Sequence, residues 1–183
     1  MSAHDRRSTG TQTDDETTEW KAGQRVPDQY KSFAHVNFTS YNRRVLITGE
    51  APNDEAKAAI EAETRKLDGV REVYNELGIG PASSLGSRST DSYIDSKVKA
   101  RLVDSNQISA NHIKVVTERA VVHLMGIVNA REAKVAVDVA RTTSGVKKVN
   151  VLEVVADEDT RRLDNQSLGA RNPPPASAPV ESR

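Results

Sequence analysis

Side chains that could carry catalysis or bind a metal are few and scattered in this sequence. It contains no cysteine, which excludes a thiol nucleophile, a thiolate metal site and a disulfide within the chain. The histidines lie far apart in the sequence: His4, His35, His112 and His123. None has a Glu or His at the helical spacing of a metal site, and neighbouring acids such as Asp54 and Glu55 diverge on a helix. The residues therefore predict a non-enzymatic protein that needs no metal or other cofactor.

A different chemistry is indicated by the amphipathic helix predicted at residues 91–104. Its core-facing stripe recurs every four residues, at Ile94, Val98 and Leu102. An adjacent stripe has the same spacing and consists of Tyr93, Lys97 and Arg101. A tyrosine ring can enter a membrane interface while its hydroxyl stays wet, and Lys and Arg can reach lipid phosphates. The stripe is therefore a candidate for membrane binding, and a solvated helix face with one half-buried tyrosine is the simpler alternative.

The elements that would position this helix occur twice along the chain. Residues 36–73 align with residues 113–149, at an offset of 77 residues that becomes 76 from Gly69 onward. Each copy has two apolar-alternating strands, a glycine at Gly49 or Gly126, a helix, and a further glycine at Gly69 or Gly145 before a third strand. Two copies are too few for a solenoid. The repeat therefore predicts two tandem small domains.

The predicted fold class is α+β, with each copy ordered helix-strand-strand-helix-strand. The strands are expected at residues 35–39, 45–48 and 70–77, and at 112–117, 121–125 and 146–155. They form a three-stranded mixed sheet with the helices on one face. The first helix of the first copy, within residues 14–33, is interrupted by Gly23 and Pro27 and is expected to be degenerate.

Composition sets the expected domain boundaries. Residues 1–15 and 157–183 are polar or proline-rich and lack apolar periodicity, so both are predicted to be disordered. The domains are then expected at 16–80 and 90–156, with a linker at 81–89. No apolar run reaches the length of a transmembrane helix, and the first residues do not form a signal peptide.

Two further features concern partners. Val135 and Val139 lie off the inward stripe of the second copy's later helix, so they either pack on the first copy or belong to a wholly buried helix. The aromatic residues Tyr30, Phe33 and Tyr41 are the expected partners in the first case. Residues 36–80 carry six basic and eight acidic residues, against ten and seven in residues 91–155. This asymmetry in charge indicates either different partners for the two copies or mere surface drift. The net charge of the whole chain is zero, which does not predict nucleic-acid binding.

The repeated unit, with its Gly-ended second strand and Gly-Val-x-x-Val entry to the third, resembles the BON domain. Two such units cover about residues 14–155. The segments 5–15, 73–76, 91–99, 125–128 and 131–133 resemble the dual-BON outer-membrane lipoproteins of Gram-negative bacteria. This resemblance implies a periplasmic protein, anchored by a lipidated N-terminal Cys, that supports outer-membrane integrity. The leader and that Cys would lie upstream of Met1.

The resemblance also implies a site and partners. It places contacts with anionic, phosphatidylglycerol-like phospholipid on the helix of the second copy, at Thr90, Ser92, Tyr93, Ile94, Ser96, Lys97 and Arg101. The family often has Trp where Tyr93 stands, which favours weaker insertion here. Envelope assembly proteins are further expected partners. The alternatives are a soluble periplasmic stress protein that binds unfolded chains, also built of BON units, and a module that docks onto an envelope complex.

Overall fold

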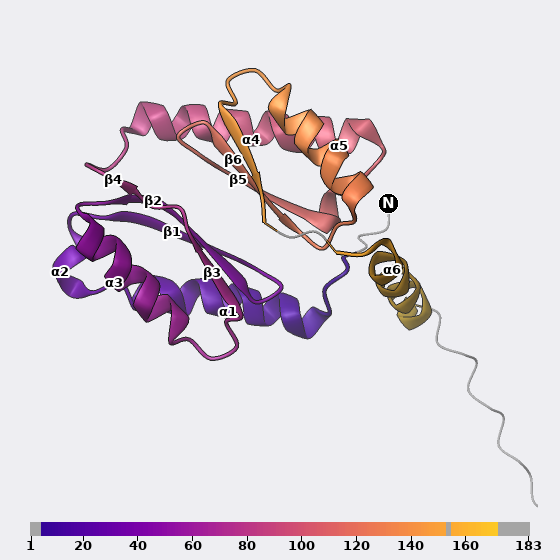
Figure 1. Ribbon diagram of the computed structural model, residues 1–183, viewed down its shortest axis with the longest axis horizontal. Coiled ribbons are helices and arrows are strands. Elements are labelled where there is room, and N and C mark those ends of the chain that lie inside the picture. Colours follow the sequence, from indigo (N-terminus) through magenta and orange to yellow (C-terminus); the bar gives the residue numbers. More distant parts are fainter. Residues whose placement is uncertain (1–4, 153–154, 172–183) are drawn as a thin grey trace, which may run out of the picture.

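The computed structural model (Figure 1) describes residues 5–152 and 155–171. The first domain contains α1 (Thr9–Gln24), α2 (Asp28–Lys31), β1 (His35–Tyr41), β2 (Arg44–Ala51), α3 (Asp54–Arg65), β3 (Glu72–Asn75) and β4 (Gly78–Ile79). The second domain contains α4 (Leu85–Ser105), a 3-10 turn η1 (Ala110–His112), β5 (Ile113–Glu118), β6 (Val121–Gly126), α5 (Ala130–Arg141) and β7 (Lys148–Val151). A last helix, α6 (Asp157–Arg171), follows.

Both domains have the same sheet topology, as the repeat predicts. Strands β1 and β2 pair antiparallel and β3 joins β2 in parallel, while the short β4 extends the same sheet along β2. Strands β5, β6 and β7 repeat the order and the directions. A glycine near the end of each second strand permits close strand contact, since a Cβ on Gly49 would lie 1.9 Å from the His35 carbonyl oxygen and one on Gly126 2.3 Å from that of His112. The prediction of two α+β domains with mixed sheets is confirmed.

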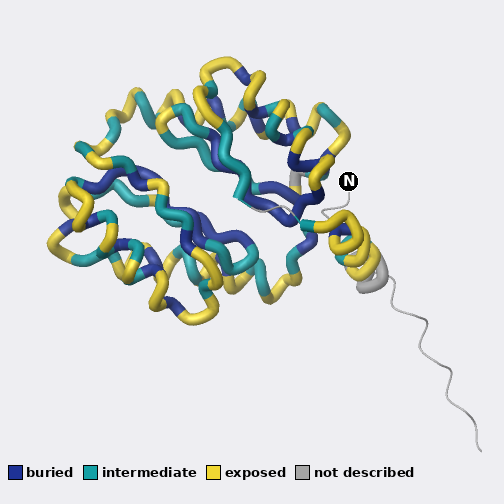
Figure 2. The backbone as a smooth tube through the Cα atoms, viewed as in Figure 1, coloured by how far each residue is buried: buried dark blue, intermediate teal, exposed yellow. Residues whose placement is uncertain are grey.

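The two sheets face each other, and the helices lie outside. Figure 1 shows α1, α2 and α3 outside the first sheet and α4 and α5 outside the second. Figure 2 shows that buried backbone follows the strands, whereas the outer helix surfaces are exposed. Each sheet therefore has one face against its own helices and one face toward the other domain.

Strand alternation explains how both faces are filled. On β2, Val45 and Ile47 join the core of the first domain, whereas Leu46 points to the opposite face. On β6, Leu124 joins the core of the second domain, whereas Met125 points away from it. The opposite-facing side chains form an interdomain cluster whose buried members are Tyr41, Leu46, Met125 and Ile127. This cluster is a third hydrophobic core, between the domains.

Each hairpin is fixed to the first helix of its domain by one aspartate. The turn residues Asn42 and Arg43 have positive φ, and their N–H groups donate to the buried Asp15 of α1 at 2.8 Å. In the second domain, the turn after β5 is held in the same way by Asp91 of α4. Its two donors are the backbone N–H groups of Arg119 and Ala120, both at 2.9 Å. The turn conformation is unfavourable for residues with a Cβ, so these charge-assisted bonds stabilise both hairpins.

The expectation of a degenerate first helix in the first domain is wrong. Helix α1 is continuous for 16 residues and begins after Ser8, whose hydroxyl accepts a hydrogen bond from the Thr11 N–H. Pro27 lies beyond the end of α1 and starts the short α2, where a proline is tolerated. Gly23 lies in the last turn, where it does not interrupt the helix. The Asp15 contact gives α1 a place in the fold that its weak apolar pattern does not reveal.

The predicted boundaries also need correction. Helix α1 begins inside the segment 1–15 and α6 occupies much of 157–183, so disorder was wrongly predicted for those helical residues. Helix α4 begins at Leu85, capped by Ser84, and takes up part of the predicted linker 81–89. Polar contacts such as those of Arg6 with Glu132 and Asp164, rather than apolar stripes, hold the two end segments. The remaining residues of both ends, 1–4 and 172–183, lie outside the described residues.

Replacing Val122 by Ala tests the core of the second domain. Val122 is fully buried on β6 among the core residues. The smaller side chain should lower the free energy of unfolding by roughly 1–3 kcal/mol, because it removes buried methyl groups and leaves a cavity. Urea denaturation followed by circular dichroism measures this loss. Val103→Ala on α4 is the control, because Val103 is 46 % exposed whereas Val122 is fully buried, and an equal loss in both variants would contradict the assignment.

Candidate functional site

Helix α4 presents an aromatic ring to solvent beside two basic side chains. The Tyr93 side chain is 65 % exposed, on the side away from the buried stripe of Ile94, Val98 and Leu102. The Lys97 ammonium lies 4.6 Å from the centre of the Tyr93 ring, within the range of a cation–π contact. Arg101 follows one turn later and is exposed. These three residues, Tyr93, Lys97 and Arg101, together make up the Tyr93 face.

The two cations of the Tyr93 face are held by the end of α5. The Lys97 Nζ donates to the Ser144 carbonyl at 2.9 Å, and the Arg101 Nη1 donates to the Val139 carbonyl at 2.8 Å. Arg101 also donates to the hydroxyl oxygens of Thr143 at 2.7 Å and Thr142 at 3.0 Å. Carbonyls at a helix C-terminus carry partial negative charge. They therefore fix Lys97 beside the Tyr93 ring and Arg101 one turn further along α4.

The other residues predicted to contact lipid fall into two groups. Thr90, Ser92 and Ser96 are exposed, and the hydroxyls of Thr90 and Ser96 donate to carbonyls of the preceding turn of α4. Ile94 is only 2 % exposed and packs in the core of the second domain. The prediction that Ile94 contacts lipid is therefore wrong for the folded domain. Its burial orients the helix so that Tyr93 faces outward.

The first domain has a different surface at the equivalent place. Since Asp15 and Asp91 have the same role, Thr17 of α1 corresponds to Tyr93 and Lys21 to Lys97. Thr17 and Lys21 line a surface hollow together with the acidic residues Asp14 and Asp68. The exposed aromatic side chain of α1 is instead Trp20, which is 67 % exposed one turn further along. Among the described residues, an exposed aromatic ring with a lysine over its face is thus found on α4 and not at the equivalent place on α1.

The residues predicted to pack between the domains are placed differently from the expectation. Tyr41 lies in the interdomain cluster, where its hydroxyl donates to the His112 carbonyl at 3.4 Å. Val135 and Val139 pack against the core of the second domain, Tyr30 belongs to the core of the first, and Phe33 is 67 % exposed. The interdomain prediction is therefore wrong for these four. Helices α3 and α5 lie outside the sheets and do not face the other domain (Figure 1).

The sequence contains an indication of the interdomain core, in the second strand of each copy. The run Val45–Leu46–Ile47 and the run Leu124–Met125 are continuously apolar, which is typical of strands buried on both faces. The prediction of one buried face assigned the contact between domains to helix residues instead. Only Tyr41, on the strand side, was placed in the correct region. Continuous apolar runs on the second strand of each repeat are therefore the better guide to how these domains meet.

Polar contacts across the domain boundary were not predicted from the sequence. The Tyr74 hydroxyl donates to the Leu152 carbonyl at 2.9 Å, and Lys114 forms an ion pair of 2.7 Å with Glu19 of α1. Arg119 donates through Nε to Glu50 at 3.0 Å. The residues that make these contacts share one feature in the sequence. They lie on the strand face opposite the core of their own domain, or in an adjacent turn or helix. The domains are therefore joined by a hydrophobic centre with polar contacts around it.

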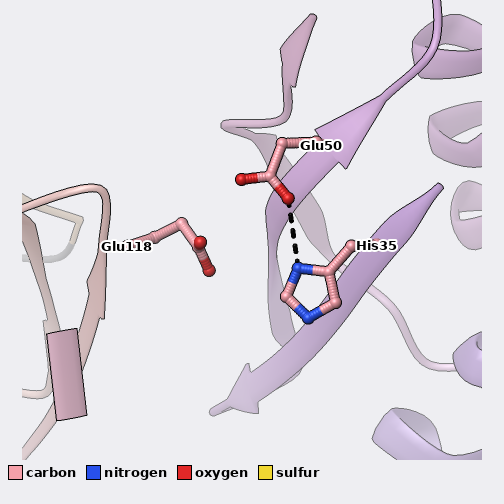
Figure 3. Close-up of side chains that lie close together, drawn as sticks. All are labelled: His35, Glu50 and Glu118. Atoms are coloured by element: carbon pink, nitrogen blue, oxygen red, sulfur yellow. Dashed lines mark hydrogen bonds and ion pairs between the residues drawn. The ribbon is translucent and has the colours of Figure 1, made fainter. Parts of the chain in front are cut away.

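A compact group of titratable residues lies at one end of this boundary (Figure 3). Glu50 at the end of β2 is fully buried and bonds to the His35 Nδ1 at 3.1 Å, while Glu118 of β5 approaches from the second domain. Burial alone raises the pKa of Glu50, but hydrogen bonds from Ser83, Arg119 and His35 lower it overall. Burial and the negative charge of Glu50 raise the pKa of Glu118. This group has no signal in the sequence, because its members come from three separate strands.

The N-terminal segment is bound to the second domain through Arg6. The buried Arg6 guanidinium donates to both carboxylate oxygens of Glu132, at 2.7 and 2.9 Å, and to the Ile127 carbonyl at 2.7 Å. It also pairs with Asp164 of α6. Glu132 is at the same time part of the capping box that starts α5 with Asn129. Arg6 therefore links the segment before α1 to α5 and α6.

Comparison with known proteins identifies the repeated unit. The model of the BON domain matches residues 14–81 and again residues 90–156. The chain belongs to the BON-domain family. As a relative, the outer membrane lipoprotein DolP of Haemophilus influenzae is 42 % identical over 149 residues, which cover 80 % of this chain and 77 % of that protein. The repeat found in the sequence is thus a tandem pair of BON domains.

Two further relatives carry different names. The 21 kDa hemolysin of Actinobacillus pleuropneumoniae is 36 % identical over 147 residues, covering 79 % of this chain and 76 % of the hemolysin. The osmotically-inducible protein Y of Escherichia coli is 33 % identical over 107 residues, covering 58 % of this chain and 51 % of that protein. No helix within the described ranges of this BON protein has both the length and the apolarity of a membrane crossing.

The Arg6–Glu132 pair should make stability depend on pH. Burial by itself raises the pKa of Glu132, but hydrogen bonds from Arg6 and the Asn129 N–H, with the charge of Arg6, bring it below the usual 4.5. A carboxylate with a lowered pKa stabilises the fold above its unfolded pKa, and this contribution is lost as the pH falls through the folded pKa. Glu132→Gln should therefore be less stable than wild type at neutral pH, and the difference should shrink below about pH 4.5.

Urea denaturation at several pH values measures this difference. Glu158→Gln is the control, because Glu158 is an exposed residue in the first turn of α6. It should follow the wild-type curve. A difference between wild type and Glu132→Gln that stays constant from neutral pH to well below 4.5 would contradict the assigned charge pairing.

Proposed function

We propose that this BON protein is a periplasmic, outer-membrane-associated protein that binds anionic phospholipid and supports the integrity of the outer membrane. It acts as a binding protein rather than an enzyme. Its relatives, which include an outer membrane lipoprotein and an osmotically inducible protein, support a place in the cell envelope. The observation that carries the lipid-binding part is the Tyr93 face, with its exposed ring beside two fixed cations.

The geometry of the Tyr93 face suits the boundary between acyl chains and headgroups. The ring of Tyr93 can be buried at the level of the glycerol backbone with its hydroxyl in water. Lys97 and Arg101 then lie at the height of the phosphates. A guanidinium has five N–H donors, and the contacts of Arg101 with α5 leave some of them for a phosphate oxygen. Since the cations are already ordered, binding costs little additional side-chain entropy.

The expected affinity of the isolated protein is low. Each basic residue near an anionic membrane contributes about 1 kcal/mol, and one aromatic ring adds a limited apolar area. Two cations and a tyrosine therefore give only transient binding. A lipidated Cys upstream of Met1 would raise the effective concentration at the membrane, so that the Tyr93 face sets orientation and lipid preference.

The lipid contact is tested by replacing the exposed aromatic side chain of each domain. Tyr93→Ala should weaken binding to phosphatidylglycerol micelles, whereas Trp20→Ala should not, because no cation within the described ranges lies over the Trp20 ring. NMR titration against zwitterionic phosphatidylcholine micelles gives both the affinity and the residues perturbed. The largest shifts should fall at Thr90–Arg101 of α4. Equal losses in both variants, or the largest shifts in the first domain, would overturn the assignment.

The electrostatic part of the proposal has its own test. Lys97→Glu should reduce binding to phosphatidylglycerol, and added salt should weaken binding of the wild type, because exposed charges are screened over ~8 Å at physiological ionic strength. Lys134→Glu on the exposed side of α5 makes the same charge change away from the Tyr93 ring and is the control. If both variants lose affinity equally, net charge and not the Tyr93 face governs binding.

A second candidate function rests on the likeness to osmotically-inducible protein Y. In that case the protein is a soluble periplasmic stress protein that binds unfolded chains. A module that docks onto an envelope assembly complex is the remaining alternative. Co-sedimentation with phosphatidylglycerol vesicles distinguishes them, since only the proposed function predicts lipid binding that is lost in Tyr93→Ala.

A further inference from the structure

We infer that His35, Glu50 and Glu118 form a divalent-metal site between the two BON domains and that Zn²⁺ is the ion it fits best. One ligand atom from each of these residues lies within 4.8 Å of the other two. His35 begins β1 and Glu50 is near the end of β2, whereas Glu118 ends β5 of the other domain. Figure 3 shows the three side chains converging from the two domains. This inference is independent of the proposed lipid binding.

The donor set determines the class of ion. One imidazole nitrogen and two carboxylate oxygens suit Zn²⁺ and related first-row ions better than Ca²⁺ or Mg²⁺, which prefer all-oxygen sites. Zinc–ligand bonds of ~2.0–2.2 Å place tetrahedral ligand atoms about 3.4 Å apart. The His35 Nδ1 and Glu50 Oε2 atoms, 3.1 Å apart, are already near that spacing. Only Glu118, which is partly exposed, must move closer.

The Glu50 carboxylate is held as a metal ligand usually is. One of its oxygens, Oε1, accepts the hydrogen bond from Arg119 at 3.0 Å, and the other, Oε2, faces His35. Hydrogen bonds from neighbouring residues orient metal-binding carboxylates and are part of such sites. Arg119 therefore fixes Glu50 without covering the oxygen that faces His35. The ion would take the place of the shared proton between His35 and Glu50.

Glu118 provides the second, independent observation. Within residues 5–152 and 155–171 its carboxylate has neither a hydrogen-bond donor nor an ion-pair partner, although the side chain is partly buried and directed at His35 and Glu50 (Figure 3). Charges removed from water are normally paired or coordinate a metal. A bound cation would supply the missing partner and offset the repulsion between Glu118 and Glu50.

The surroundings leave room for the remaining coordination position. A cleft of about 400 Å³ is lined by His35 and Glu118, together with Asp91, Ser92 and Asp95 of α4. A water molecule can therefore complete a three-residue site, and an ion can enter from this side. The repeat does not reproduce the arrangement, because Ile127 stands where Glu50 stands in the first domain. We therefore expect a single ion per chain.

The ion would hold the two domains together. Two ligands belong to the first domain and one to the second, so binding requires the observed contact between the sheets. An ion that binds only this arrangement stabilises it by mass action. Zinc should therefore raise the midpoint temperature of thermal unfolding and restrict separation of the domains.

Calorimetric titration of the full chain, free of any affinity tag and treated with a chelator, tests the site with Zn²⁺ alone. We expect one ion per chain and a shift of the His35 imidazole resonances in NMR spectra. Glu118→Gln should weaken zinc binding by roughly tenfold or more. Mutation of a residue that only hydrogen-bonds to a metal ligand already lowers the metal affinity by about that factor, and Glu118 is proposed as a ligand itself. It should also remove the zinc-dependent rise in unfolding temperature.

Two controls make the outcome decisive. Glu118→Gln removes a carboxylate that has no partner among the described residues, so the variant should fold like wild type without zinc. Glu55→Gln removes an exposed carboxylate of α3 and should bind zinc like wild type. Absence of saturable binding by the wild type, or equal binding by wild type and Glu118→Gln, would overturn the proposal. So would His35 resonances that zinc leaves unchanged.

Discussion

Burial of the second face of each sheet is the constraint on which the rest of this structure depends. Each domain has helices on one side of its sheet only, so the opposite face would expose apolar side chains if the domain stood alone. Leu46 and Met125 lie on those faces and are almost completely buried where the sheets meet. Each BON domain therefore completes the core of the other. The face-to-face packing in turn fixes which residues remain available for function.

One consequence is that the outer helices are free to carry a surface function. Because the sheets meet through their strands, α4 packs only on its own domain through the buried stripe of Ile94, Val98 and Leu102 and leaves Tyr93 exposed to solvent. The packing also brings the ends of β2 and β5 together at the domain boundary, where Glu50 and Glu118 meet. The surface on α4 and the polar group at the boundary are thus two results of a single arrangement.

Sequence reasoning succeeded where local pattern and packing agree. The alternation of Val45 and Ile47 predicts β2, and the helix expected after the second strand of each copy forms as α3 and α5. The same reasoning failed for α1, α6 and the segment around Arg6, because these are held by a few polar contacts between residues distant in sequence. A buried pair such as Arg6 and Glu132, 126 residues apart, leaves no periodic signal. Such contacts are visible only when the tertiary structure brings their partners together.

The two BON domains have kept the same framework while their equivalent positions have taken different chemistry. Asp15 and Asp91 hold the two hairpins in the same way, so this contact belongs to the shared fold. In contrast, Tyr93 stands where the first domain has Thr17, and Glu50 stands where the second has Ile127. The Tyr93 face can therefore belong to one domain and the buried carboxylate to the other, and only the pair presents both. Duplication of a small domain with two apolar sheet faces thus explains both why the copies stay together and why they were free to diverge on their remaining surfaces.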